Sequence, residues 1–396
     1  MFVLTPTLHA SHWGSTTAIH QFAQWPTTGS PLAEVWYGAH SSASSLASAG
    51  TEEARSLRDI IHADPEAILG NDVVARFGRE LPFLLKVIAP ASPLSLQVHP
   101  SLEQAGLGWA REERAGIALT AAERTYKDGN HKPEMLYALT DCEAVSGFRA
   151  PRRAIEVLTG LDAPLIHSTL ERLRQGTSAA GMRAAFEYML LGARDRDGDV
   201  AVIVEQIRAR LAAGESPSVH SDTIALTIAE HYPGDRGIVA SLLLNPVTLR
   251  AGEALFVPAG CVHAYLSGLG VEVMANSDNV VRAGMTTKHV DARALLDILD
   301  VRPSPPIRLG PERSRAGVEV FYAPVEDFEL AVIEAGATPV AVGGAGPRIV
   351  LGIEGEVTLR LASREIVLRP ADAVLVCEGE LADVVGSGRV VRASVP

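Results

Sequence analysis

Hydrophobic and polar residues alternate with a period of two over much of the chain, as they do in β-strands that bury one face. The clearest case is LSLQVHP at residues 94–100, where leucine and valine occupy one face. Ser95, Gln97 and His99 occupy the other. Short apolar runs broken by glycine-containing turns also fill residues 249–275. This pattern predicts a mainly β protein whose strands bury one face and carry reactive groups on the other.

The spacing of apolar residues changes to every three or four positions between residues 151 and 234, which indicates helices. Strand-like alternation then returns, and a proline-rich connector at 302–308 precedes a last β-rich segment. The sequence therefore predicts one β domain built from residues 1–150 and 235–305, an inserted helical domain at 151–234, and a second β domain at 306–396.

Two β segments resemble each other within the chain. LRPADAVLVCEGELADV, which starts at Leu368, aligns with LRAGEALFVPAGCVHAY, which starts at Leu249. In this alignment Ala382 occupies the place of His263. The simplest explanation is a duplicated β module whose second copy lacks the histidine.

The composition is that of a globular protein. The 396 residues are 47% hydrophobic and 21% charged, which suits two or three domains with their own cores. The formal net charge of −12 argues against nucleic acid or an anionic membrane as the main partner. Three widely spaced cysteines without a CxxC pair fit a reducing cytoplasm. Since there is neither a signal-peptide pattern nor an apolar stretch of ~20 residues, we expect a soluble cytoplasmic protein.

One lysine stands inside an apolar run. Lys86 interrupts LPFLLKVIA at residues 81–89, a run that we interpret as a buried strand. An unpaired ammonium is costly to bury, so this group must either reach water or meet an anion. The sequence leaves both explanations open.

Four residues could bind a metal ion. The run at 130–139 is expected to be extended because Pro133 disfavours a helix, which places Lys132 and Glu134 on a common face. Two imidazoles, a carboxylate and an amide oxygen form a ligand set that suits zinc and also accepts Mn, Fe or Co. The alternative is that the histidines are core residues satisfied by backbone groups. The candidate ligands are Gln97, His99, Glu134 and His263.

Three ordered motifs resemble the signatures of type I mannose-6-phosphate isomerase, also called phosphomannose isomerase. They are SLQVHP, NHKPEM with the following ALTDCEAVSGFR, and GEALFVPAGCVHAYLSGLGVEVMANSDNVVRAGMTTKHVD. The resemblance implies a cupin-type β-barrel or jelly roll as the catalytic domain, a helical insertion and a second, non-catalytic cupin-like β domain. It also implies one Zn²⁺ per chain on the four candidate ligands. The implied reaction interconverts mannose 6-phosphate and fructose 6-phosphate by proton transfer through a cis-enediol.

The resemblance also implies roles for other residues. Arg282 is expected to stabilise developing negative charge on the substrate oxygen. The general base stays open among four candidates, of which we favour the first: Glu272, Lys132, Asp278 and His131. The substrate phosphate is expected to contact Ser95, Lys86 and Lys288. We expect a small sugar phosphate as the partner, no nucleic acid or membrane, and a monomer, with an oligomer left open.

Some positions depart from the family pattern. Ser11-His12 replaces the usual Tyr-Ala, Cys261 replaces an Asn, and Thr287 replaces a Pro. None of these changes removes a ligand, but they put substrate preference in doubt. The alternatives are therefore an isomerase of another aldose or aldose phosphate, a non-catalytic sugar-phosphate-binding cupin, or a cupin oxygenase with a redox metal.

Overall fold

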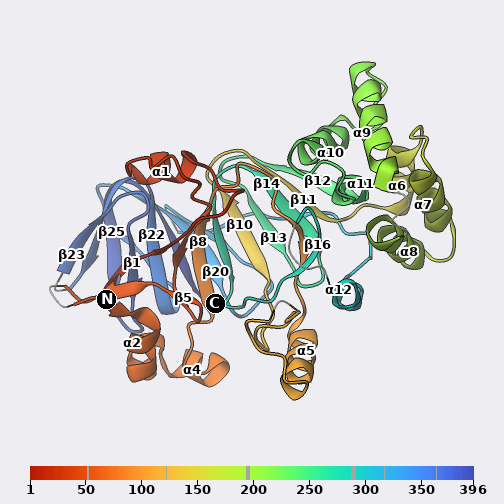
Figure 1. Cartoon of the computed structure of the whole chain (residues 1–396). Coiled ribbons are helices and arrows are strands. Elements are labelled where there is room, and N and C mark those ends of the chain that lie inside the picture. The colour runs from red at the N-terminus through yellow and green to blue at the C-terminus, as the bar shows by residue number, and fades with distance from the viewer. Residues whose placement is uncertain (51–52, 122, 193–196, 287–290, 316, 363) are drawn as a thin grey trace.

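The chain forms a stack of β-sheets with helices at one end (Figure 1). The computed structural model describes residues 1–50, 53–121, 123–192, 197–286, 291–315, 317–362 and 364–396. Neighbouring strands pair in antiparallel fashion. We call the main sheets I, II and III, in order from the helices outward.

Sheet I lies next to the helices. Its strands follow the order β12 (Leu244–Leu249), β11 (Cys142–Phe148), β14 (His263–Ser267), β9 (Leu96–Val98) and β16 (Val281–Gly284). Sheet II is the middle layer. Its order is β17 (Ile307–Leu309), β13 (Ala254–Val257), β10 (Glu134–Ala138), β15 (Gly270–Ala275), β8 (Phe83–Ile88), β3 (Glu34–Tyr37) and β2 (Thr7–His9).

Sheet III joins both ends of the chain. Its order is β18 (Glu312–Arg315), β19 (Val318–Phe321), β20 (Glu329–Ala335), β25 (Ala382–Val395), β22 (Ala345–Leu361), β24 (Ala373–Val376), β1 (Phe2–Thr5), β6 (Leu46–Ser48) and β7 (Arg55–Ser56). β21 (Val340–Ala341) pairs with β25, β23 (Arg364–Leu368) pairs with β22, and β4 (Ala39–His40) pairs with β5 (Ala43–Ser44).

Sheet II is buried on both faces because its side chains alternate between two cores. Met135 and Tyr137 of β10 pack in the core shared with sheet III. Leu136 and Ala138 of the same strand pack in the core shared with sheet I. A large apolar side chain such as Met135 or Leu136 contributes about 1.5–3 kcal/mol when fully buried. The period of two therefore determines which residues of sheet II face sheet I.

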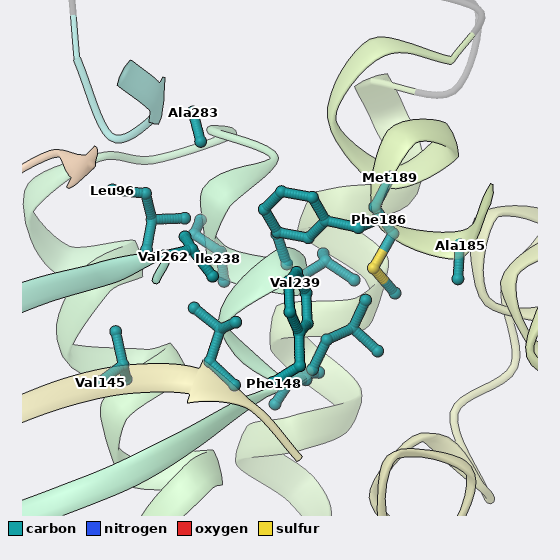
Figure 2. Close-up of a cluster of buried hydrophobic side chains, with 14 of the residues drawn as sticks. Leu96, Val145, Phe148, Ala185, Phe186, Met189, Ile238, Val239, Val262 and Ala283 are labelled. Carbon is teal, nitrogen blue, oxygen red and sulfur yellow. The ribbon is translucent and has the colours of Figure 1, made fainter. Parts of the chain in front are cut away.

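The helical segment packs directly on the outer face of sheet I. Its core includes Leu96 of β9 and Val262 beside β14 together with helix residues (Figure 2). Phe148 at the end of β11 meets Phe186 edge to face at 4.9 Å between ring centroids. The helices there are α6 (Pro151–Leu158), α7 (Pro164–Arg174), α8 (Ser178–Leu191), α9 (Asp197–Ala212), α10 (Val219–His231) and α11 (Gly237–Ser241). A mainly β protein with a helical insertion is thus confirmed.

The remaining helices lie on loops around the sheets. They are α1 (Ala18–Ala23), α2 (Leu57–Ala63), α3 (Pro65–Leu69), α4 (Asn71–Phe77), α5 (Leu102–Arg114) and α12 (Ala292–Ile298). α5 begins with a reciprocal capping box. The Ser101 hydroxyl accepts from the Gln104 backbone nitrogen, and the side-chain oxygen of Gln104 accepts from the Ser101 backbone nitrogen. None of the helices in the described ranges has both the length and the apolar composition needed to cross a bilayer.

The internal resemblance coincides with matching strands. β13 and β14 begin at Ala254 and His263, and β24 and β25 begin at the aligned Ala373 and Ala382. The division into domains at residues 150, 235 and 305 stays a prediction. In sheet III, β1 pairs with β24 and β6, so this strand belongs structurally with the C-terminal strands.

Candidate metal centre and active-site cavity

The proposed ligands come from facing surfaces of sheets I and II. Gln97 of β9 lies opposite His263 of β14, and His99 follows β9. Leu96 and Val98 turn the other way into the helical core, which leaves Gln97 on the face toward sheet II. Glu134 begins β10 of sheet II. Residues distant in sequence therefore meet between two sheets.

Three of these side chains converge on one point. The ligand atoms of His99, Glu134 and His263 lie within 4.8 Å of one another, and all three residues are buried. The Nε2 atom of His99 lies 3.2 Å from Glu134 Oε1, and the Nε2 atom of His263 lies 3.2 Å from Glu134 Oε2. Tetrahedral zinc ligands at about 2.0–2.1 Å from the metal are separated by about 3.3 Å. The spacing fits such an ion.

Backbone carbonyls fix both imidazoles in the form that a metal requires. His99 Nδ1 lies 2.7 Å from the carbonyl oxygen of Asn279, and His263 Nδ1 lies 3.1 Å from that of Cys261. An Nδ1–H that donates to a carbonyl leaves a lone pair at Nε2. The buried Nε2 of His99 has no well-formed hydrogen bond, although Glu134 is near it. Acceptor atoms thus face one another, an arrangement that a cation between them would stabilise.

The protonation states also suit metal binding. Burial lowers the pKa of His99 to about 4, so this imidazole is neutral at pH 7. Burial alone would raise the pKa of Glu134, but the pKa lies well below its usual value, and the charge of the Lys132 ammonium helps to lower it. Lys132 Nζ lies 3.3 Å from Glu134 Oε1. His99 is therefore neutral and Glu134 is charged at pH 7, so neither residue has to lose a proton before it can bind a metal ion.

A cavity of about 350 Å³ lies beside these residues, between sheets I and II. Gln97, Glu134 and His263 form part of its wall. The other predicted residues that line it are Ser95, Lys86, Lys132, Glu272, Asp278 and Arg282. The structure thus brings together most of the residues that the sequence singled out.

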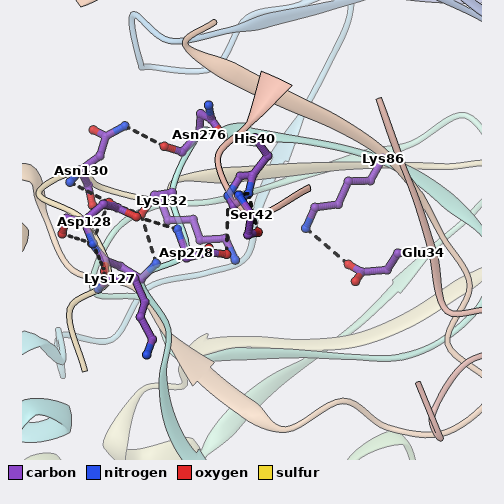
Figure 3. Close-up of polar contacts among 12 residues, drawn as sticks. Glu34, His40, Ser42, Lys86, Lys127, Asp128, Asn130, Lys132, Asn276 and Asp278 are labelled. Carbon is purple, nitrogen blue, oxygen red and sulfur yellow. Dashed lines mark hydrogen bonds and ion pairs between the residues drawn. The ribbon is translucent and has the colours of Figure 1, made fainter. Parts of the chain in front are cut away.

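Lys86 is buried among carboxylates. Its Nζ lies 3.0 Å from Glu272 Oε2 and 3.4 Å from Glu34 Oε1, and the second contact is drawn in Figure 3. Burial would lower the pKa of Lys86, but these carboxylates raise it above its usual value. Of the two explanations left open by the sequence, the contact with an anion is confirmed, and the anions belong to the protein.

Glu272 has the environment of a proton-transfer group. It is 3% exposed, and burial together with the charge of Glu134 raises its pKa, partly offset by Lys86. A carboxyl whose pKa is moved upward toward neutrality is a better general base at pH 7. Arg282, opposite Gln97 in the neighbouring strand β16, makes no ion pair with any residue that the structure describes. Its guanidinium is available to a ligand in the cavity.

His131 lies outside this cavity. Its Nε2 is 2.9 Å from Asp327 Oδ2 of the C-terminal segment, and it lines a separate cavity of about 990 Å³. Pro133 faces the same larger cavity, whereas Lys132 and Glu134 face the metal centre. The alternation of an extended segment separates the two sets of residues. Of the four base candidates, Glu272, Lys132 and Asp278 line the cavity at the metal centre, and His131 does not. Lys288, a candidate for phosphate binding, falls outside the described residues.

The sequence analysis assigned no role to part of the cavity wall. Glu34 and Trp36 of β3 line it, as does Tyr265 of β14. The ring of His9 stacks on Trp36 at 4.0 Å between centroids. The signal was present in the alternation of β3, because Val35 between these two residues is fully buried on the other face.

Comparisons with known proteins agree with this geometry. Residues 1–151 match the family described as "Phosphomannose isomerase type I, catalytic domain". The mannose-6-phosphate isomerases of Salmonella typhimurium and Escherichia coli are 37% and 36% identical, each over 96% of both chains. A solved zinc-bound mannose 6-phosphate isomerase superposes with a TM-score of 0.90 at 34% identity, covering 100% of this chain and 99% of that one. A mutant of the Salmonella enzyme gives a TM-score of 0.91 with the same coverage. On this likeness along nearly its whole length, the chain belongs to the type I mannose-6-phosphate isomerase family.

Proposed function

We propose that this protein is a zinc-dependent aldose–ketose isomerase that interconverts mannose 6-phosphate and fructose 6-phosphate. The observation that carries the proposal is the convergence of His99, Glu134 and His263 beside a cavity that contains Glu272 and Arg282. The relatives named above carry this activity in their names, and one of the similar structures is described as zinc-bound.

Gln97, His99, Glu134 and His263 would hold the metal. When bound there, Zn²⁺ would act as a Lewis acid that stabilises negative charge on the substrate carbonyl oxygen. The carbonyl contacts at Nδ1 of both histidines keep the Nε2 lone pairs directed at the shared point. These residues supply the metal site and take no part in moving protons.

The proton transfer is assigned to the protein's own carboxylate. Glu272 would remove the proton from C2 of open-chain mannose 6-phosphate, and the electron pair would form the C1–C2 double bond of a cis-enediol as the C1 oxygen gains a proton. The same carboxyl would return its proton to C1 while the C2 hydroxyl loses one and becomes the ketone. Lys132 and Asp278 line the same cavity and would carry protons at the oxygens. Arg282 would stabilise negative charge on those oxygens, worth about 3 kcal/mol on the scale of a single oxyanion donor.

The phosphate contacts are proposed at Ser95, Lys86 and Lys288. Ser95 and Lys86 line the cavity wall, which supports their part. Lys86 would have to serve the phosphate while it also neutralises Glu272 and Glu34. Around the site we propose a catalytic cupin domain of residues 1–150 and 235–305, the helical domain 151–234 and a C-terminal cupin-like domain 306–396. We further propose a cytoplasmic monomer without nucleic-acid or membrane partners.

The test is an isomerase assay combined with metal analysis. Purified protein loaded with zinc should form fructose 6-phosphate from mannose 6-phosphate and should contain about one zinc per chain. Other aldose phosphates and free mannose, assayed in parallel, test substrate preference at the altered cleft positions. Fully zinc-loaded protein that forms no fructose 6-phosphate would rule out the proposed substrate.

A further inference from the structure

A partly buried hydrogen-bond network joins two loops beside the metal centre. The first loop, residues 127–131, leads into β10, and the second, residues 276–280, connects β15 with β16. The members of this network, which we call the Asp128–Asn279 network, are Lys127, Asp128, Asn130, Ser277, Asp278 and Asn279. Figure 3 shows the first-loop members clustered beside Asp278.

Asn279 is the centre of the network and is 1% exposed. Its Oδ1 accepts from the Lys127 amide nitrogen at 2.7 Å. Its Nδ2 donates to the carbonyl oxygens of Asp128 and Asn130, each at 2.8 Å, and to Asp128 Oδ1 at 3.1 Å. Acceptors surround one end of the amide and donors the other, so only one orientation of this side chain fits.

Asp128 completes the network with its carboxylate. Oδ1 accepts from the Ser277 hydroxyl at 2.8 Å and from the Asn130 backbone nitrogen at 2.9 Å. Oδ2 accepts from the Asp278 amide nitrogen at 2.8 Å. A carboxylate that accepts several backbone and hydroxyl donors forms strong charge-assisted bonds. Both loops are therefore tied to one group.

The network reaches the metal centre through the main chain. The carbonyl oxygen of Asn279 is the group that holds Nδ1 of His99, at 2.7 Å. The Asn279 side chain does not itself form the bond to His99, but it fixes the loop that orients the Asn279 carbonyl. Asn130 lies only a few residues before Lys132 and Glu134, and the Asp278 backbone is held by Asp128.

We propose that Asn279 and Asp128 are positioning residues of the metal centre. Together they orient His99 through the Asn279 carbonyl and hold the segment that presents Glu134. This inference rests on the proposed zinc site. It adds two supporting residues that contact neither the metal nor the substrate. Partners that orient metal ligands typically change metal affinity by about 10- to 100-fold when they are lost.

Two variants test the proposal. Asn279→Asp places a carboxylate oxygen against the acceptors that now face Nδ2, and Asp128→Asn removes one carboxylate acceptor while keeping the size of the side chain. We expect both to weaken zinc binding by about 10- to 100-fold in chelator competition. The kcat of the zinc-saturated variants should fall while KM changes by less than about twofold, since no substrate contact is removed.

The matched control is Asp222→Asn in the helical insertion. The Asp222 carboxylate is 0% exposed and accepts from Arg210 Nε at 2.8 Å and from the Ser216 hydroxyl at 2.7 Å. This variant removes a carboxylate that, like Asp128, accepts several hydrogen bonds, but that lies in the helical insertion and pairs with Arg210. It should lower stability and leave zinc affinity unchanged.

A second readout does not need the metal. In the zinc-free protein, nitrogen NMR of labelled histidine reports whether His99 carries its proton at Nδ1. The network variants should lose this tautomer preference, and Asp222→Asn should keep it. If zinc-free wild type shows the tautomer but binds no zinc or forms no product, the proposed function fails while the positioning role stands.

The proposal is overturned if folded Asp128→Asn binds zinc and fixes His99 as wild type does. It is also overturned if Asp222→Asn weakens zinc binding as much as the network variants, because the loss would then reflect stability alone. Should Asn279→Asp and Asp128→Asn fail to fold, Ser277→Ala decides the question by the same measurements. It removes the hydroxyl that donates to Asp128 Oδ1 and to the Asn130 carbonyl and that accepts from the Asn279 backbone nitrogen.

Discussion

His263 lies directly opposite Gln97 where β14 pairs with β9. On the other side of β9, Arg282 of β16 also lies opposite Gln97. Directly paired residues of adjacent strands point to the same face of a sheet with their Cβ atoms about 4.5–5.5 Å apart. The register of sheet I thus aligns an imidazole, an amide and a guanidinium in one row facing Glu134 of sheet II.

The first prediction concerns this row. His263→Ala removes one of the converging nitrogens and should abolish zinc binding, with a loss of isomerase activity on the order of 10³ or more. Metal analysis and the isomerase assay measure both effects. His167→Ala is the matched control, because His167 is an exposed imidazole of the helical segment paired with Asp162. Full activity in His263→Ala would refute the metal assignment.

The second prediction is a pH dependence of the zinc-free protein. The pKa of His99 is lowered by burial to about 4 from its usual 6.5. Below pH 6.5 the unfolded chain binds a proton that the folded protein refuses, so stability is complete above pH 6.5 and falls as the pH drops toward 4. The difference of about 2.5 pKa units corresponds to about 3 kcal/mol.

Denaturant unfolding of zinc-free wild type and His99→Gln between pH 4 and 7 tests this effect. Glutamine does not titrate, so the variant should lose about 3 kcal/mol less stability than wild type across that interval. Other histidines with lowered pKa values, such as His9 and His40, contribute equally to both proteins. Parallel curves for the two proteins would contradict the lowered pKa.

The third prediction concerns the buried charges around Lys86. Lys86→Met leaves Glu272 and Glu34 without their ammonium, and loss of one partner from a buried ion pair costs about 3 kcal/mol or more. The double variant Lys86→Met with Glu272→Gln should recover part of this loss. Urea unfolding of both single variants and the double variant gives the coupling free energy. A coupling near zero would mean that the pair contributes nothing.

The fourth prediction concerns thiol reactivity. Burial raises the pKa of Cys142 and Cys261 to about 11. At pH 8 each should therefore hold about 100-fold less thiolate than a thiol of pKa 9, and its reactivity should increase about tenfold per pH unit up to pH 11. Disulfide-exchange reagents should react slowly with the folded protein and rapidly in guanidinium. Cys142→Ser and Cys261→Ser assign the signals, and rapid reaction of Cys261 at pH 8 would contradict its raised pKa.

Local periodicity was sufficient to predict which face of a strand carries the chemistry. Leu96 and Val98 are fully buried on the helical side and Gln97 lies on the other face, as the alternation predicts. Leu94 departs from the prediction, because it lines the cavity and packs in the core between sheets I and II. The same reasoning separates Lys132 and Glu134 from His131. The family resemblance had grouped His131 with them, but its ring lies in the separate cavity beside Asp327, and its catalytic role stays a prediction.

Periodicity could not reveal partners from distant strands. Lys86 of β8 lies between Trp36 of β3 and Glu272 of β15 in the register of sheet II. These strands are far apart in sequence, and their alignment results from the packing of whole sheets. The sequence could therefore indicate that Lys86 reaches either water or an anion, but it could not identify Glu272 and Glu34 as the anions.

The position of β1 in sheet III has a consequence for how the protein is made. A ribosome synthesises β1 near the start and its neighbour β24 some 370 residues later. At about 5–20 residues per second, β1 waits roughly 20 to 75 s for this partner. During that time the nascent chain exposes an unpaired strand edge, which can pair with other chains. We therefore expect the yield of correctly folded protein to depend on how well this N-terminal strand is protected during translation, for example by chaperones.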